Sequence, residues 1–364
     1  MSVGVNLNFS NYFQPAMSDE EMYANEFRLA IAAEDMGFDM LNAVEHHFDD
    51  YALCPNNFIV LANLAAKTKQ IKLCLGAIVV PWHHDILRIA ENIAQLDTIT
   101  DGRLLVSFAR GLAKDEYDGF RVDMAEARGR FDEATRFITE TLRSGVAEYD
   151  GDFFKQPRVE IRPRMPRPLD GRLFSAATSI DSVPSVAKLG AGIVTVNQGG
   201  IEALMPSITA HREIFKETFG REAPRPTIAE VMFCHEDAAE AERIAREYAA
   251  KNLVTILGHY RLIDVDWSKV KGYEAYAAGQ QMMIAAGKEA LFEAYVANQL
   301  WGTPEQIIEK YRQRVAITGG HDLVLTCSFA GLPYDLVESS MRLFAAEALP
   351  TIHAIEREQT SVAA

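Results

Sequence analysis

Two adjacent histidines follow a glutamate in the segment Glu45-His46-His47-Phe48. Histidine is the side chain whose charge changes nearest to neutral pH, and a carboxylate beside it can fix its tautomer or hold its proton. Neighbouring residues on an extended chain point to opposite sides, so at most one of the two histidines is expected to face a given pocket. The segment therefore predicts either a proton-transfer site or a pair of hydrogen-bonded structural histidines.

A second group of residues is suited to binding an anion. Arg110 follows an apolar run and precedes Gly111, which permits a tight bend, and Arg128 lies near the start of the next expected helix. Guanidinium groups bind phosphate through paired hydrogen bonds. Hydroxyls at another expected helix start, where free N–H groups also favour phosphate, belong to Thr178, Ser179 and Ser182. Taken singly, the arginines are more typical of surface ion pairs, and the hydroxyls more typical of ordinary helix caps, than of an anion site.

Gly76 and Ala77 begin the apolar stretch that continues to Pro81. A strand segment without bulky side chains allows a planar ring to lie against its backbone. The alternative is that the glycine accommodates close packing between strands.

These residues must be positioned by regular elements, and the chain alternates short apolar runs with amphipathic stretches. Eight such runs with helices between them predict an α/β protein with a (β/α)₈ barrel, formed as a single domain over residues 1–364. Glu45, Arg110 and Thr178 all follow a run, at the strand ends where barrels of this kind carry their active sites. The expected strands are Val3–Asn8, Phe38–Val44, Ile71–Val80, Leu104–Ala109, Leu173–Ala177, Gly192–Val196, Thr227–Phe233 and Leu323–Cys327.

Helix limits are also legible. Ser18 followed by acidic residues predicts a helix start, and Gly37 predicts its end. Thr303 before Pro304 predicts another start.

Two stretches interrupt the alternation. Residues 148–167 predict a hairpin insertion, which we expect to cover one rim of the barrel. Residues 257–301, rich in aromatic side chains, are too long for a simple connection before the eighth strand. They predict either a lid over the site or a helical subdomain packed on the barrel.

Composition narrows the class of protein. The net charge of −15 argues against binding to nucleic acid or to an anionic membrane, and no run is long enough to span a bilayer. The four cysteines are far apart, without Cys-x-x-Cys or His-x-x-x-His spacing, so neither a metal site nor a disulfide framework is expected. A cytoplasmic location is expected. Dinucleotide and P-loop glycine motifs are absent from the sequence.

The residues above, in this order, resemble the bacterial luciferase-like flavin-dependent monooxygenases, and the similarity is close to the luciferase α subunit. It extends over nearly the whole chain. The segments that carry it are Met36-Gly37-Phe38-Asp39, Glu45-His46-His47-Phe48, Ala77-Ile78-Val79-Val80-Pro81, Asp101-Gly102-Arg103, Arg110-Gly111-Leu112, Val122-Asp123-Met124 with Arg128, Gly302-Thr303-Pro304 and Met341-Arg342-Leu343-Phe344.

The resemblance implies roles for individual residues. His46 matches the catalytic histidine, implied to assist a flavin C4a-peroxide and to move protons, with Glu45 beside it. Gly76-Ala77 matches a non-proline cis peptide under the flavin ring. The positions that match the FMN phosphate site are Arg110, Arg128, Ser179 and Ser182, while Thr178 stands where the luciferase has a glutamate near the flavin's polar tail.

The resemblance also implies a reaction. The expected protein is a two-component monooxygenase that takes reduced FMN from a separate flavin reductase and uses O₂ to oxidise a hydrophobic carbonyl compound, an aldehyde or ketone. Two alternatives are an oxidoreductase that uses the deazaflavin F420, and a flavin-binding subunit without catalytic activity. A homodimer, or a dimer with a related subunit, is expected. Ala109 and Ala113 replace larger side chains of the luciferase, which implies a roomier pocket.

Overall fold

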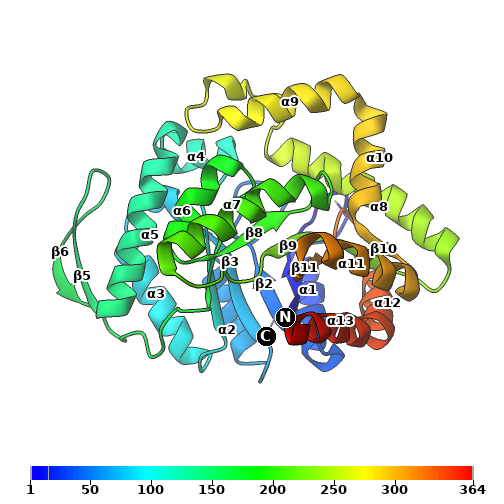
Figure 1. Ribbon diagram of the computed structural model, residues 1–364, viewed down its shortest axis with the longest axis horizontal. Coiled ribbons are helices and arrows are strands. Elements are labelled where there is room, and N and C mark those ends of the chain that lie inside the picture. Colours follow the sequence, from blue (N-terminus) through cyan, green and yellow to red (C-terminus); the bar gives the residue numbers. More distant parts are fainter. Residues whose placement is uncertain (1, 15, 363–364) are drawn as a thin grey trace.

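Eight parallel strands close into a barrel in the computed structural model, which describes residues 2–14 and 16–362 (Figure 1). Pairing of the last strand with the first and of β8 with β9 completes the circle. The predicted (β/α)₈ barrel is therefore confirmed. The strands are β1 Val3–Leu7, β2 Met40–Ala43, β3 Lys72–Val79, β4 Leu104–Ala109, β7 Leu173–Ala176, β8 Gly192–Val196, β9 Thr227–Cys234 and β11 Asp322–Thr326. Each limit lies at or next to the predicted residue, except that β2 begins at Met40 rather than Phe38.

Helices surround the barrel, and their ends follow the capping residues. The Ser18 hydroxyl accepts a hydrogen bond from the Glu21 backbone N–H, and Gly37 ends the same helix at φ 90°. Thr303 and Gln306 form a capping box at the start of α11. The helices are α1 Asp19–Met36, α2 Asn57–Ala65, α3 Ile86–Ile99, α4 Lys114–Phe120, α5 Ala127–Ser144, α6 Val183–Lys188, α7 Ile201–Phe219, α8 Ala238–His259, α9 Glu274–Ala286, α10 Lys288–Asn298, α11 Pro304–Thr318, α12 Tyr334–Leu343 and α13 Leu349–Val362. Shorter 3₁₀ turns span Val80–Trp82, Met124–Glu126, Ile180–Ser182 and Trp267–Lys269, and a π-helix spans Phe344–Ala348.

Strand register brings the candidate residues to one edge of the barrel. Ala43 at the end of β2 pairs with Leu75, and Val79 at the end of β3 pairs with Ala109. Because the strands are parallel, the residues that follow them emerge on the same side. Glu45-His46, Gly76-Ala77 and Arg110 therefore lie near one mouth of the barrel.

The expected hairpin is present, but it lies elsewhere than predicted. Strands β5 Val146–Asp150 and β6 Lys155–Glu160 pair antiparallel in a sheet of their own. Glu133 of α5 accepts hydrogen bonds from the backbone N–H groups of Asp152, Phe153 and Phe154 in the connecting turn. The hairpin thus packs against α5 on the outside of the barrel (Figure 1), and the expectation that it covers a rim was wrong.

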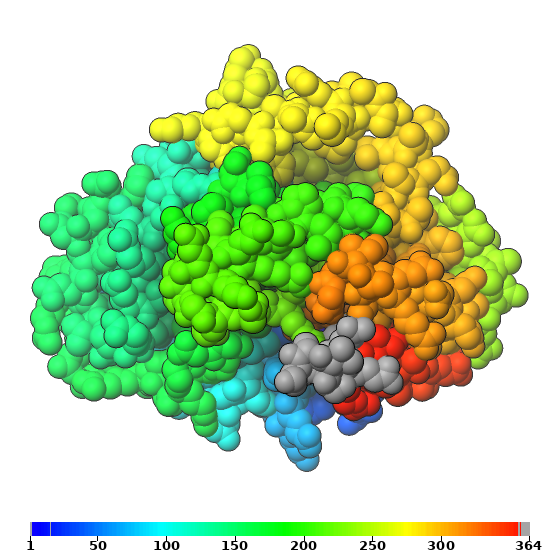
Figure 2. Space-filling model, in the orientation of Figure 1, coloured from blue at the N-terminus to red at the C-terminus, as the bar shows by residue number. Residues whose placement is uncertain are grey.

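Residues 257–301 are helical and arch over the molecule, in yellow in Figures 1 and 2. They contain the end of α8, then α9 and α10, and finally the short strand β10 Leu300–Gly302, which pairs with the end of β9 and was not predicted. Trp267, Tyr273 and Tyr295 are buried in a cluster with Trp82 and Tyr117. The segment therefore packs against the barrel through apolar side chains, as expected for a helical subdomain.

The whole chain was expected to be one domain over 1–364, and residues 1, 15, 363 and 364 of that range lie outside the described residues. Within the described residues, no helix is long and apolar enough to cross a membrane.

Candidate active site

A cavity of about 640 Å³ occupies the barrel. Its walls include residues at both ends of the strands, from Ser2 and Asp322 at one end to His46 and Arg110 at the other. The helical segment forms part of the wall through Tyr276, among others. The volume is in the range of about 300–1,000 Å³ that is usual for cofactor and ligand pockets. The predicted residues that line the cavity are Glu45, His46, Gly76, Ala77, Arg110, Thr178, Ser179 and Ser182.

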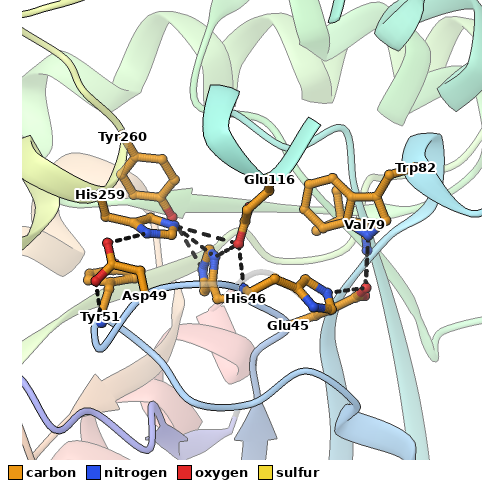
Figure 3. Close-up of polar contacts among 10 residues, drawn as sticks. Glu45, His46, Asp49, Tyr51, Val79, Trp82, Glu116, His259 and Tyr260 are labelled. Atoms are coloured by element: carbon orange, nitrogen blue, oxygen red, sulfur yellow. Dashed lines mark hydrogen bonds and ion pairs between the residues drawn. The ribbon is translucent and has the colours of Figure 1, made fainter. Parts of the chain in front are cut away.

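His46 lies at the centre of a polar cluster on one wall of this cavity (Figure 3). Its Nδ1 is 3.1 Å from Glu116 Oε1 and 3.2 Å from His259 Nε2, and its Nε2 is 3.3 Å from the Tyr260 hydroxyl. Glu116 Oε1 also accepts a hydrogen bond of 2.7 Å from the His47 backbone N–H. The side chain of His46 is 15% exposed, so it is held by protein groups but remains accessible from the cavity.

His259 ends helix α8 and is itself held in place. Its Nδ1 is 3.2 Å from Asp49 Oδ2, and its ring stacks on Tyr51 with 4.4 Å between the centroids. Burial lowers the pKa of His259, and the hydrogen bond to Asp49 opposes this only in part. Burial thus favours the neutral form of the ring. Burial also raises the pKa of Tyr260 well above its ordinary value, so that hydroxyl keeps its proton.

Glu45 contacts other groups than those we expected. It accepts hydrogen bonds from the Val79 backbone N–H at 2.9 Å and from Trp82 Nε1 at 3.0 Å, and it contacts the rings of His47 and His83. Burial alone would raise the pKa of Glu45, but these hydrogen bonds outweigh it and lower the pKa to about 2. In the described part of the chain, the carboxylate that contacts His46 is that of Glu116.

Alternation along the chain explains this correction. Residues 45 and 47 point to one side and residue 46 to the other, so Glu45 meets His47 while His46 faces the cavity. Glu45 anchors the loop after β2 to the end of β3. The carboxylate that orients His46 is that of Glu116, not that of Glu45.

Arg110 and Arg128 lie close enough to interact. Burial lowers the pKa of Arg128, and the positive charge of Arg110 lowers it further. Among the described residues, neither guanidinium forms an ion pair with a carboxylate. One N–H of Arg110 donates to the Gly272 carbonyl at 2.6 Å, and its guanidinium lies 3.9 Å from the centre of the Tyr273 ring. Two adjacent cations without a carboxylate partner are an arrangement suited to an anion.

Gly111 allows the chain to turn away after Arg110, as predicted. It has φ 82°, and a side chain there would meet Val79 at 2.7 Å.

The three predicted hydroxyls follow β7. Ser179 and Ser182 lie 3.0 Å apart through their Oγ atoms, and the Thr178 hydroxyl is 2.7 Å from that of Tyr276 in α9. Helix α6, which begins after Ser182, has only six residues. Any anion bound after β7 would therefore be held mainly by these hydroxyl groups, because α6 is too short to contribute a large helix dipole.

The peptide bond between Gly76 and Ala77 is cis, as the resemblance implied. Both residues line the cavity. The position that a side chain at residue 76 would take is filled by Asn42, whose Oδ1 would lie 1.6 Å from it. Asn42 also donates to the Gly76 carbonyl at 3.0 Å. This favours our alternative interpretation, in which the glycine permits close packing between β2 and β3.

Sequence reasoning missed four members of the His46 cluster: Asp49, Glu116, His259 and Tyr260. Asp49 and Glu116 follow two of the motifs closely, and their position just past a strand end was the available signal. His259 ends helix α8 and Tyr260 follows it, more than 200 residues after His46. Both belong to the segment 257–301, which was predicted as a lid or a helical subdomain. Nothing in their local sequence indicates that they contact His46.

The sequence is similar to a known protein family and to several of its members. The family model described as luciferase-like monooxygenase matches residues 1–321. The alkanal monooxygenase alpha chain of Aliivibrio fischeri is 27% identical over 86% of this chain and 89% of its own length. The oxygenase component of a flavin-dependent trigonelline monooxygenase from Acinetobacter baylyi is 23% identical over 95% of each chain.

Solved structures share this fold. Monooxygenase RslO1 from Streptomyces bottropensis superposes with a TM-score of 0.78 at 25% identity, over 96% of this chain and 99% of that one. The oxygenating constituent of 3,6-diketocamphane monooxygenase from Pseudomonas putida, in complex with FMN, has a TM-score of 0.73 at 18% identity, over 96% and 98%. An F420-dependent secondary alcohol dehydrogenase has a TM-score of 0.71 at 16% identity, over 96% and 98%. The latter two share the fold. Because the family model covers most of the sequence, the chain belongs to the luciferase-like monooxygenase family.

Proposed function

We propose that the protein is the oxygenase component of a two-component system, which takes reduced FMN from a separate reductase and uses O₂ to oxidise a small hydrophobic carbonyl compound. The observation that carries the proposal is the layout of the cavity. One part of its wall presents His46 with proton-exchanging partners, and another presents Arg110. Arg128 is not a lining residue, but it lies close enough to Arg110 to feel its charge.

The described residues fit a flat cofactor with a phosphate. Arg110 and Arg128 supply N–H donors that form no ion pair with a carboxylate of the described residues, and Ser179 and Ser182 add hydroxyls beside the same cavity. Thr178 contributes a further hydroxyl at this end. Gly76 and Ala77 line the wall on which the ring would lie. Reduced FMN, when bound, supplies the electrons that activate O₂.

His46 then serves as the group that exchanges a proton. Glu116 accepts at Nδ1 and orients the ring, which leaves Nε2, beside the Tyr260 hydroxyl, as the atom that gives or takes a proton. The helical segment 257–301 forms part of the cavity wall and limits the contact of the cavity with bulk water. Its aromatic and aliphatic side chains suit an apolar substrate.

Binding measurements test the phosphate site. Arg110→Ala and Arg128→Ala are expected to weaken FMN binding by about 10- to 100-fold, because each removes a charge-assisted hydrogen bond. Riboflavin, which lacks the phosphate, should bind the variants as it binds the wild type. Arg88→Ala, at an exposed ion pair with Glu91, is the matched control. Equal losses for FMN and riboflavin would contradict the assignment.

Oxygen consumption tests the cofactor. With chemically reduced FMN and a panel of aldehydes and ketones, we expect O₂ uptake coupled to product. Activity with reduced F420 and none with reduced FMN would instead support the deazaflavin alternative. Tight FMN binding without product over the whole panel would support a noncatalytic subunit. A dimer and a cytoplasmic location remain part of the proposal, and light scattering in solution tests the former.

A further inference from the structure

Three potential metal-ligand atoms converge in the His46 cluster. His46 Nδ1, Glu116 Oε1 and His259 Nε2 form a triangle with sides of 3.1, 3.2 and 3.7 Å. We propose that these atoms bind a divalent transition-metal ion such as Zn²⁺, with a fourth position open to the cavity. The sequence offered no metal motif because the three ligands come from separate segments of the chain.

The distances suit a tetrahedral ion. Zinc lies about 2.0–2.1 Å from histidine nitrogen and about 2.0–2.2 Å from carboxylate oxygen, so ligand atoms in a tetrahedral site are about 3.3 Å apart. Two of the three distances in the triangle are slightly shorter than this value, and the third is longer. Two histidines and a glutamate, with an open fourth position, are also a ligand set found in catalytic zinc sites.

The positions of the protons on His46 and His259 favour a cation between the three ligand atoms. Asp49 faces Nδ1 of His259 and can only accept a hydrogen bond, so Nδ1 carries a proton, and in this tautomer Nε2 directs a lone pair towards His46. A single proton on His46 Nδ1 cannot satisfy both His259 Nε2 and Glu116 Oε1. A metal ion would accept a lone pair from all three atoms at once.

Surrounding groups already support the ligands. Asp49 orients His259 from behind, and the Tyr260 hydroxyl contacts the Nε2 of His46 that a metal would leave free. Such partners fix the ring of a metal-binding histidine and strengthen its binding. In the described part of the chain, no lysine or arginine forms an ion pair with Glu116 or Asp49, so their charges are available to a cation.

A path to the site also exists. The side chains of Glu116 and His259 are 2% and 3% exposed, but Glu116 and His46 line the cavity. An ion can therefore enter from the cavity and keep a water or substrate oxygen as its fourth ligand. If the proposed function holds, a metal bound at Nδ1 of His46 competes with proton transfer and inhibits oxygenation.

Cobalt titration of the full-length protein without flavin tests the site. We expect one Co²⁺ per chain, with the visible absorption of a tetrahedral complex, and displacement by Zn²⁺. His259→Gln and Glu116→Gln should lower the affinity by about 100-fold or more, and Asp49→Asn by about 10- to 100-fold. His84→Ala, which removes an exposed histidine on the same side of the barrel, is the matched control and should bind like the wild type.

Circular dichroism establishes that each variant is folded, and thermal unfolding gives a second readout. Zn²⁺ should raise the Tm of the wild type and of His84→Ala but leave that of Glu116→Gln unchanged. Absence of one-to-one binding, or binding that survives both His259→Gln and Glu116→Gln, would overturn the proposal. Neither measurement depends on oxygenase activity, so this proposal and the proposed function can fail separately.

Discussion

At the scale of single residues, His46 should matter for turnover more than for cofactor binding. His46→Ala is expected to keep FMN affinity within about tenfold of the wild type, while oxygenation falls by about 10²-fold or more. The reason is that His46 contacts Glu116, His259 and Tyr260, whereas the phosphate is assigned to Arg110 and Arg128. Single-turnover product yield with prebound reduced FMN measures this. Undiminished turnover would remove His46 from the mechanism.

Glu45 should matter for stability, in a way that depends on pH. Its pKa falls from an ordinary 4.5 to about 2 in the folded protein. A lowered folded-state pKa stabilises the protein above pH 4.5, and the contribution is lost as the pH falls towards 2. Glu45→Gln should therefore cost on the order of 3 kcal/mol at pH 7. The difference should shrink below pH 4.5, as measured by urea unfolding across this range. A constant difference at all pH values would refute the account.

Part of this site could be predicted from the sequence, since strand-end residues are assigned by local pattern alone. The contact of Glu45 with His47 also follows from local alternation. The contact between His46 and His259 does not, because it requires the end of α8 to fold over the loop after β2. Contacts that join distant segments leave no local pattern.

At the scale of elements, the barrel strands were predicted nearly to the residue because buried parallel strands are continuous apolar runs bounded by turn residues. Strand β10 was missed because three residues are too few to show any periodicity. The hairpin was recognised, but its position depended on Glu133 of α5, whose contacts with backbone N–H groups no pattern reveals.

The helical segment should open more easily when its contacts with the phosphate site are removed. Tyr276→Phe deletes the hydrogen bond to Thr178, which is worth about 0.5–1.5 kcal/mol. Proteolytic cleavage within residues 257–301 should then become about two- to tenfold faster, and FMN should slow it. The turn of the hairpin at residues 151–153 provides an internal control site. Equal cleavage of the wild type and of Tyr276→Phe within residues 257–301 would show that this contact does not hold the segment closed.

At the scale of the whole molecule, barrel closure joins the beginning of the chain to its end. β1 pairs with β11 and with β2, so neither half of the described chain completes a barrel alone. Calorimetry should therefore show one cooperative unfolding transition for the full chain. Two separated transitions would contradict the assignment of a single domain.

Net charge sets a second constraint at this scale. A protein with a net charge of −15 must attract a phosphate locally, which is why an arginine pair without carboxylate partners carries the argument.

The most direct test of the central claim follows the oxygen atom. The protein is mixed with chemically reduced FMN, a panel of hydrophobic aldehydes and ketones, and ¹⁸O₂, and the products are analysed by mass spectrometry. We predict a product that contains one ¹⁸O atom, whose formation requires both reduced FMN and His46. Bound FMN with no labelled product from any member of the panel would contradict the claim that this cavity is a monooxygenase site.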